Sequence, residues 1–240
     1  MSDRSPSRSE PESKQRAPAK PSGAGVPPAV FLPQGSRLTT RSRRLPHWEV
    51  QDAVYIVTFR LVDSLPKNAL KQLIMRRTDI LVTAAQLRRT LTASERKKRD
   101  QLQARRIERN LDAGAGECFL KISAIAQVIA NALKEFDGSR YRLFAWCVMP
   151  NHVHVVFQTI GNNSLAGILH SWKSYSAKVA NQILGRNGEF WQREYHDHLI
   201  RDRAEFDRAV AYILENPSKA GLKNWRWVWS WMSAPHADLG

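Results

Sequence analysis

The chain has 240 residues, 42% of them hydrophobic, which is enough for a folded domain with a buried core and too apolar for a chain that is disordered throughout. No stretch approaches the roughly 18 apolar residues that a membrane span needs, and residues 1–16 lack the apolar region of a secretory signal, so we expect a cytoplasmic protein with no membrane partner. Lysine and arginine total 37 against 22 acidic residues, and the resulting net charge of +15 favours a polyanionic partner such as nucleic acid.

Prolines are concentrated at the N-terminus, where eight of the 12 lie within residues 1–46. A segment of this composition cannot bury apolar area, so residues 1–46 are predicted to form a disordered tail before a domain at residues 47–240. The tail ends in a basic run that includes Arg41, Arg43 and Arg44. We interpret this run as an arm that binds a phosphate backbone, while the rest of the tail is either part of that arm or a solubilising extension.

The domain is predicted to begin with a strand and a basic helical insertion. The run AVYIVTFRL at residues 53–61 places Tyr55, Val57 and Phe59 on one face of a strand. Residues from 68 to about 110 are predicted to form one or two helices, the second half of which is strongly basic. These helices are either a solvated hairpin or a basic face laid along nucleic acid, and the composition leaves both interpretations open.

The middle of the domain combines one helix with a pair of strands. Residues 122–136 place isoleucine and leucine at helical spacing, which predicts a helix that packs on the core. Residues 141–149 and 152–158 are rich in β-branched and aromatic residues and are separated by Pro150 and Asn151. They are therefore predicted to form an antiparallel pair.

Two further helices flank an extended segment. A long amphipathic helix is predicted at residues 165–184, ended by Gly185. Residues 190–201 are predicted to be a strand or extended, and a last helix is expected from about residue 204 to Asn216, where Pro217 halts it. Strands mixed with helices in this order favour an α+β fold, in which helices pack on an antiparallel sheet.

Two histidines in the second strand of the pair are separated by a single residue. Because side chains alternate along a strand, His152 and His154 project from one face while Val153 faces the other. Such a pair can bind one divalent cation through two nitrogens, with a third ligand from elsewhere in the fold. Spacing alone favours the alternative, which is two ordinary strand histidines.

The last predicted helix carries a tyrosine and an asparagine in register. Tyr212 and Asn216 are four residues apart, so they lie one turn apart on the same helix face. A phenol hydroxyl beside an oxygen ligand, presented to a metal, can perform phosphoryl transfer. The alternative is a surface tyrosine and a helix-capping asparagine. Tyr175 and Tyr195 are competing nucleophile candidates, and the register with Asn216 favours Tyr212.

Three segments in order resemble a known family. The runs MPNHVHVVF, WQREYHDHLIRD and YILENPSKAGL are similar to those of REP-associated tyrosine transposases, which belong to the HUH single-tyrosine transposases of the IS200 group. The resemblance covers roughly residues 48–231, and the ordered combination is more specific than any one motif. It implies a ferredoxin-like HUH core. It also favours a functional role for His152 and His154 over ordinary strand histidines, and a functional role for Tyr212 and Asn216 over a surface tyrosine and a helix-capping asparagine.

The resemblance also implies roles for individual residues. His152 and His154 match the HUH histidines, Tyr212 matches the nucleophile, and Asn216 stands where relatives often supply glutamine as a third metal ligand. The expected cofactor is Mg²⁺ or Mn²⁺. The implied activity is a metal-dependent endonuclease and strand transferase for DNA transposition, acting on single-stranded or hairpin DNA through a 5′-phosphotyrosine intermediate. A monomer and a homodimer both stay open.

Several residues and functions remain as alternatives. Lys173 is a further candidate for contact with DNA phosphate, alongside the basic run of the tail. The tryptophans near the C-terminus are predicted either to stack on unpaired bases or to cover the sheet. They are Trp225, Trp227, Trp229 and Trp231. The principal alternative function is a catalytically silent, sequence-specific DNA-binding protein on the same fold, and a relaxase-type enzyme or an RNA-directed protein are further alternatives.

Overall fold

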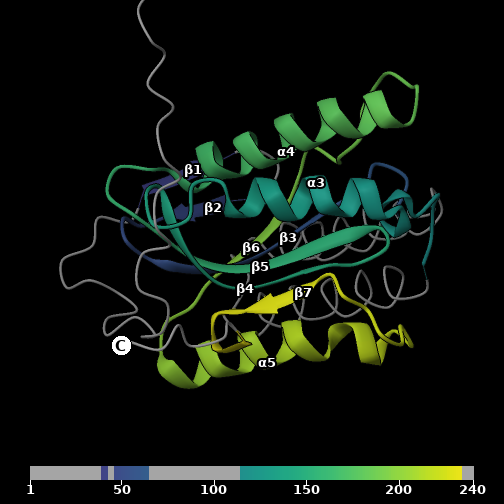
Figure 1. Cartoon of the computed structure of the whole chain (residues 1–240). Helices are drawn as coiled ribbons and strands as arrows, with labels where there is room; N and C mark the ends of the chain where they lie inside the picture. The colour runs from purple at the N-terminus through teal and green to yellow at the C-terminus, as the bar shows by residue number, and fades with distance from the viewer. Residues whose placement is uncertain (1–38, 43–45, 65–113, 234–240) are drawn as a thin grey trace, which may run out of the picture.

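The protein is described here by a computed structural model that covers residues 39–42, 46–64 and 114–233. A five-stranded sheet with the strand order β6-β3-β5-β4-β7 forms its centre (Figure 1). The strands of this sheet are β3 (Val54–Arg60), β4 (Tyr141–Val148), β5 (His152–Thr159), β6 (His196–Leu199) and β7 (Val228–Ser230). Every neighbouring pair in it is antiparallel.

The described helices pack on both faces of the sheet. They are α3 (Ser123–Lys134), α4 (Leu165–Ile183) and α5 (Arg203–Lys219), with short 3-10 turns η1 (Phe119–Lys121) and η2 (Trp231–Ser233). In Figure 1, α3 and α4 lie on one side of the sheet and α5 lies on the other. The predicted α+β class, with helices on an antiparallel sheet, is confirmed.

The topology of the central strands is ferredoxin-like. The chain passes from β3 to α3, β4, β5, α4 and β6, and these four strands lie in the order β6-β3-β5-β4. This is the βαββαβ arrangement of the ferredoxin-like fold. After β6, the helix α5 crosses the face of the sheet that α3 and α4 leave open. The strand β7 follows α5 and extends the sheet beyond β4.

Side-chain alternation divides the core into two layers. On β3, Tyr55, Val57 and Phe59 join the larger cluster beneath α3 and α4. Val54 faces the other way and packs with Ile213 and its apolar neighbours on α5. The face toward α5 therefore has the smaller apolar layer, and it is also the face to which the alternation on β5 directs the histidines.

The last helix does not end where the sequence predicts. Pro217 was expected to halt this helix, but it lies inside α5. A proline removes one backbone N–H, yet the N–H of Ala220 still donates to the carbonyl of Asn216 at 3.0 Å. The helix closes at Gly221, whose φ of 72° allows the N–H of Leu222 to donate back to the carbonyl of Pro217.

Two strand pairs were not predicted. The strands β1 (Thr39–Ser42) and β2 (Pro46–Glu49) pair with each other, within a stretch expected to be disordered up to residue 46. The tryptophan-rich stretch contributes β7, whose Trp229 stacks on Trp146 of β4. The indole of Trp225 donates to the carbonyl of Val148 at 2.8 Å, so these tryptophans cover the sheet.

Other predictions concern parts of the chain that the structure does not describe. The tail up to residue 38 and the basic helical insertion predicted at residues 68–110 both lie outside the described residues. Among the helices that are described, none combines the length and the apolar character required to cross a bilayer.

Candidate active site

The two histidines of β5 meet on the sheet face that α5 covers. His152 is 1% exposed and His154 is 2% exposed. Their Nε2 atoms are 2.9 Å apart, and the ring planes are nearly perpendicular at 84°. Both imidazoles therefore project from the same face, as the alternate spacing predicts.

Each ring is oriented by a polar side chain at its other nitrogen. Nδ1 of His152 lies 2.7 Å from Oδ1 of Asn151, and Nδ1 of His154 lies 2.7 Å from Oγ1 of Thr58. The amide of Asn151 is itself held, because its Nδ2 donates to the carbonyl of Ala115. Since an amide oxygen only accepts, Nδ1 of His152 donates the hydrogen, and Nε2 of that neutral ring presents a lone pair toward its neighbour.

Burial keeps both imidazoles uncharged. Desolvation, together with a smaller effect of the nearby His196, lowers the pKa of His154 to about 3. Desolvation also places the pKa of His152 well below 6.5, assisted by His154 and Arg60. Neutral imidazole is the form that binds metal ions, so the pair is ready to act as ligands at neutral pH.

The helix α5 brings the predicted nucleophile to this pair. Oη of Tyr212 lies 3.4 Å from Nε2 of His154, and the two rings meet edge to face with centroids 5.2 Å apart. The helix is anchored at its start by Asp202, whose side chain accepts from the N–H of Glu205, and along its length by Ile213 in the core. The phenol and the two imidazoles thus converge from α5 and β5.

Asn216 supplies a buried oxygen one turn beyond the phenol. It is 3% exposed, and its Oδ1 has no hydrogen-bond partner within the described part of the chain. Ile200 lies shortly before α5, and its N–H donates to the carbonyl of Val54. The helix therefore begins beside the Val54 end of β3, and from there it runs toward the end of β5 that carries His152. A buried amide oxygen left unpaired costs about 1–3 kcal/mol, which a ligand in its vicinity would offset.

These groups fit a divalent cation. Over the described residues, no cluster of three histidine, cysteine or acidic side chains has metal-binding geometry, so a third ligand has to be of another kind. The amide oxygen of Asn216, which is unpaired among the described residues, is a group of that kind, and the two imidazoles offer neutral nitrogens. Two ligands at about 2.1 Å from one ion and at right angles lie about 3 Å apart, which agrees with the separation of 2.9 Å between the Nε2 atoms.

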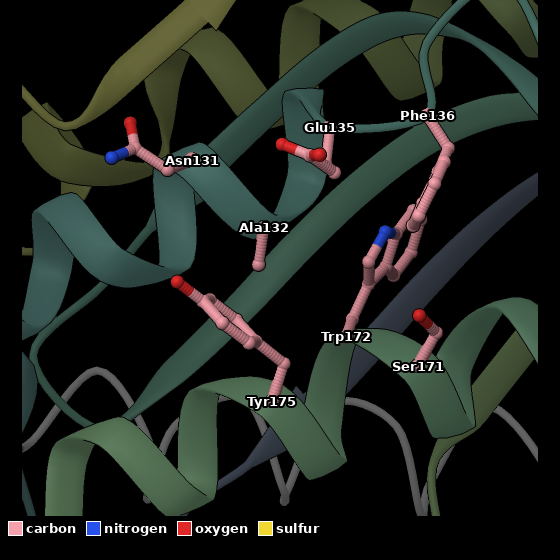
Figure 2. A pocket seen from close by; sticks show the side chains of 7 residues that line it. All are labelled: Asn131, Ala132, Glu135, Phe136, Ser171, Trp172 and Tyr175. Carbon is pink, nitrogen blue, oxygen red and sulfur yellow. The ribbon is translucent and has the colours of Figure 1, made fainter. Parts of the chain in front are cut away.

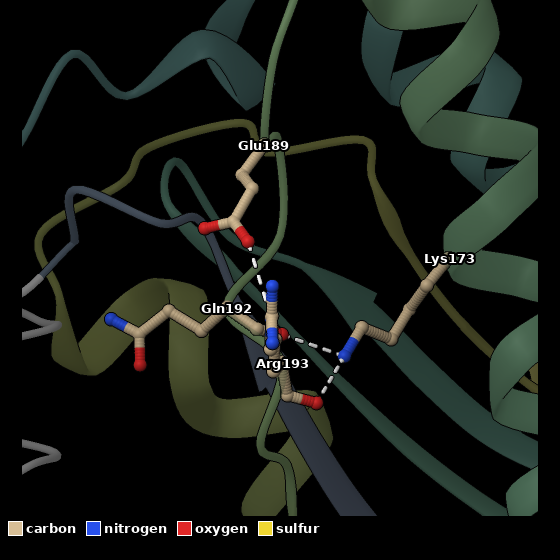
Figure 3. A network of polar contacts seen from close by, with 4 residues as sticks. All are labelled: Lys173, Glu189, Gln192 and Arg193. Atoms are coloured by element: carbon tan, nitrogen blue, oxygen red, sulfur yellow. Dashed lines mark hydrogen bonds and ion pairs between the residues drawn. The ribbon is translucent and has the colours of Figure 1, made fainter.

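Lys173 is already engaged within the protein (Figure 3). Its Nζ donates to the carbonyls of Gln192 at 2.6 Å and Arg193 at 2.8 Å, and burial lowers the pKa of this amine to about 8. Lys173 therefore ties α4 to the segment before β6, and its contact with DNA stays a prediction. Of the basic run, Arg41 lies in β1, whereas Arg43 and Arg44 lie outside the described residues.

The competing tyrosines do not join the histidine pair. Tyr175 is 54% exposed on α4, beside a pocket of about 370 Å³ that Figure 2 shows between α3 and α4. The carboxylate of Glu135 also lines this pocket, which disfavours a phosphate ligand there. Tyr195 packs against the core cluster beneath α3 and α4, and Lys173 Nζ lies 6.0 Å from its ring centroid. Both lie on the sheet face opposite Tyr212.

Sequence reasoning overlooked three polar residues around the pair. Thr58 and Arg60 stand on β3 opposite His154 and His152 in register, and Asn151 is the residue immediately before β5. A signal was present, because Thr58 and Arg60 alternate with the apolar face of an otherwise hydrophobic strand. Assigning these two residues to the site requires knowledge that β3 pairs with β5, and that pairing joins residues almost 100 positions apart in the sequence.

Comparison with known proteins supports the resemblance. Residues 120–216 match the family model of IS200-like transposases, and this region contains both histidines, Tyr212 and Asn216. A Haemophilus influenzae protein named as a REP-associated tyrosine transposase is 27% identical over an alignment of 99 residues, and the match covers 35% of this chain and 56% of that protein. The chain thus spans about half the length of this relative.

A solved structure of a REP-associated tyrosine transposase bound to a REP hairpin is also similar, at 15% identity and a TM-score of 0.42. The similarity covers 79% of this chain and 82% of that chain. The predicted resemblance to REP-associated tyrosine transposases is confirmed over the matched residues.

Proposed function

We propose that this chain, which carries the IS200-like transposase sequence over residues 120–216, cuts and rejoins single-stranded or hairpin DNA through Tyr212. The observation that carries the proposal is the distance of 3.4 Å between Oη of Tyr212 and Nε2 of His154, beside a second neutral imidazole. A phenol, two imidazoles and an unpartnered amide oxygen have no evident structural use together. Together they can supply the nucleophile and the metal ligands of a phosphoryl-transfer reaction.

The side chains divide the chemistry between them. His152, His154 and Asn216 would hold the divalent cation, which polarises the scissile phosphate when it is bound. Oη of Tyr212 forms a bond to phosphorus while the bond from phosphorus to the 3′ oxygen breaks. The phenol proton passes to solvent, and the departing 3′ oxygen takes up a proton to become a hydroxyl. The 5′ end stays on the protein as a phosphotyrosine ester, which a 3′-hydroxyl can attack to rejoin the strand.

The substrate class follows from charge and from the matched relatives. The net charge of +15 supports a nucleic acid, and the family match supports DNA in a transposition reaction. We also propose that the protein acts in the cytoplasm. Charge does not distinguish DNA from RNA, so an RNA hairpin of the same sequence belongs in the test.

The test is formation of a covalent adduct. The full chain is incubated with end-labelled hairpin DNA containing single-stranded flanks and Mn²⁺, and the products are separated on a denaturing gel. We expect a DNA–protein adduct with the wild-type chain, no adduct with Tyr212→Phe or with chelator, and equal hairpin binding by both proteins. Hairpin binding without any adduct would favour the catalytically silent DNA-binding protein, and an adduct with RNA alone would overturn the substrate class.

A further inference from the structure

Arg60 stands beside the histidine pair on the same face of the sheet. It lies two residues after Thr58 on β3, and Thr58 is bonded to His154. In the β3–β5 register Arg60 is directly opposite His152. Its positive charge also contributes to the lowered pKa of that histidine. A guanidinium group is therefore part of the surroundings of the site.

The charge of Arg60 has no anionic partner among the residues that the structure describes. Its Nε donates to Oε1 of Gln192 at 2.7 Å, which is a neutral acceptor. The side chain is half-buried, and desolvation lowers its pKa to about 10. A desolvated cation without a counter-charge is costly, so such a group marks a place where an anion binds.

Gln192, which holds Arg60, is itself fixed by one side-chain contact and two backbone contacts. The N–H of Gln192 donates to the carbonyl of Arg60 at 2.9 Å, and its Nε2 donates to the carbonyl of Val62 at 3.3 Å. The carbonyl of Gln192 accepts from Nζ of Lys173, as Figure 3 shows. The orientation of Arg60 is thus set through its Nε, which leaves both terminal NH₂ groups without partners in the described part of the chain.

We propose that Arg60 is a further catalytic residue, which donates from its terminal NH₂ groups to a non-bridging oxygen of the scissile phosphate, and that Gln192 positions it. This inference rests on the proposed function. The planar guanidinium matches a phosphate in geometry and charge, and a donor fixed in advance stabilises the charge that develops in the transition state. Arg60 and the cation site would then approach the phosphate from neighbouring strands.

The test separates cleavage from binding. Single-turnover cleavage of a hairpin DNA with Mn²⁺ and the Kd for the same hairpin are measured for the wild-type chain, Arg60→Ala, Arg60→Lys and Gln192→Met. We expect Arg60→Ala to cleave about 10²–10³-fold more slowly, with a Kd within about threefold of the wild-type value. Arg60→Lys keeps the charge but loses the fork, so its rate lies between the two. The matched control is Arg142→Ala. Arg142 is an exposed arginine near the start of β4, and the variant should cleave at the wild-type rate.

A rescue experiment and a folding control keep the result unambiguous. Ethylguanidinium added to Arg60→Ala should restore part of the rate, because the missing group itself is returned. If Arg60→Ala fails to fold by thermal melting, Gln192→Met tests the same arrangement, and a normal rate in that variant would contradict it. If the wild-type chain cleaves the hairpin and a folded Arg60→Ala variant cleaves it at the same rate, the role of Arg60 is overturned and the proposed function is not. No adduct with the wild-type chain overturns the proposed function, and this inference with it.

Discussion

The hydroxyl of Thr58 and Nδ1 of His154 lie 2.7 Å apart across the β3–β5 pair, where the two residues are direct partners in register. This contact holds the imidazole so that its Nε2 faces both His152 and Tyr212. Partners of this kind commonly account for 10–100-fold in metal affinity or activity. The substitution Thr58→Val keeps the shape of the side chain and removes the contact.

We expect Thr58→Val to weaken Mn²⁺ binding by about 10-fold or more in titration calorimetry, with a parallel loss of cleavage. The matched control is Thr159→Val on the same strand pair, because Oγ1 of Thr159 is buried without a partner among the described residues. Thr159→Val should bind Mn²⁺ normally. Equal affinities for the wild-type chain and Thr58→Val would refute the role assigned to Thr58.

Asn216 offers a test in which stability and binding move in opposite directions. Its buried Oδ1 has no partner within the described residues, so Asn216→Leu removes an unpaired polar group. We expect the unfolding free energy of the metal-free variant to be larger by about 1 kcal/mol or more, which raises its melting temperature. We also expect this variant to bind Mn²⁺ more weakly. Thermal melts with and without Mn²⁺ check both parts. A variant that is stabilised by Mn²⁺ as strongly as the wild-type chain would remove Asn216 from the ligand set.

Local sequence patterns predicted much of the fold because they report which face of an element is buried. Alternation on β5 placed His152 and His154 on one face, and the four-residue spacing placed Tyr212 and Asn216 together on α5. The order of the strands was not predictable in this way. It depends on pairings such as Thr58 with His154 and with His196, which join distant parts of the chain.

Two further differences have local causes. Pro217 removes a single N–H near the end of α5, and the turn at Gly221 closes the helix, so the proline did not act as the stop that its type suggests. The tryptophans near the C-terminus fit either bases or a core, and only the pairing of β7 with β4 separates these possibilities. The sequence predicts that Lys173 contacts DNA phosphate, and it does not reveal the backbone carbonyls that Nζ binds, because no sequence pattern marks such acceptors.

Substitution of Lys173 tests whether this lysine acts by holding the segment around Gln192 or by contacting DNA directly. Its Nζ holds the carbonyls of Gln192 and Arg193, and Gln192 bonds to Arg60. We expect Lys173→Met to lower the unfolding free energy by about 1–3 kcal/mol and to slow cleavage, with the hairpin Kd unchanged. The control is Lys178→Met, an exposed lysine on the same helix. A weaker Kd in a stably folded Lys173→Met would instead identify a phosphate contact.

The start of α5 gives the protein a defined acid sensitivity. Burial raises the pKa of the Glu205 carboxyl, but hydrogen bonds from the N–H of Arg201 and from His198 outweigh this and hold the pKa below its ordinary value of 4.5. Because the folded pKa is depressed, this carboxylate contributes stability above pH 4.5, and the contribution disappears as the pH falls through the folded pKa.

We therefore expect Glu205→Gln to be less stable than the wild-type chain at neutral pH and to lose less stability on acidification. Denaturant unfolding from pH 7 down to about pH 3 measures both slopes. Asp207→Asn is the control, because Asp207 forms an exposed ion pair with Arg203 that contributes little. Parallel pH curves for the wild-type chain and Glu205→Gln would contradict the role of this carboxylate.

We propose that Tyr212 carries the DNA, and identification of the modified peptide distinguishes it from the other candidate tyrosines. Trypsin cuts after lysine and arginine, so the three candidate tyrosines fall in separate peptides: residues 209–219 contain Tyr212, residues 174–178 contain Tyr175, and residues 194–201 contain Tyr195. The adduct formed with hairpin DNA and Mn²⁺ is digested with nuclease and trypsin and analysed by mass spectrometry. We expect a nucleotide mass on the peptide 209–219 alone, and a nucleotide on either of the other two peptides would contradict the role of Tyr212.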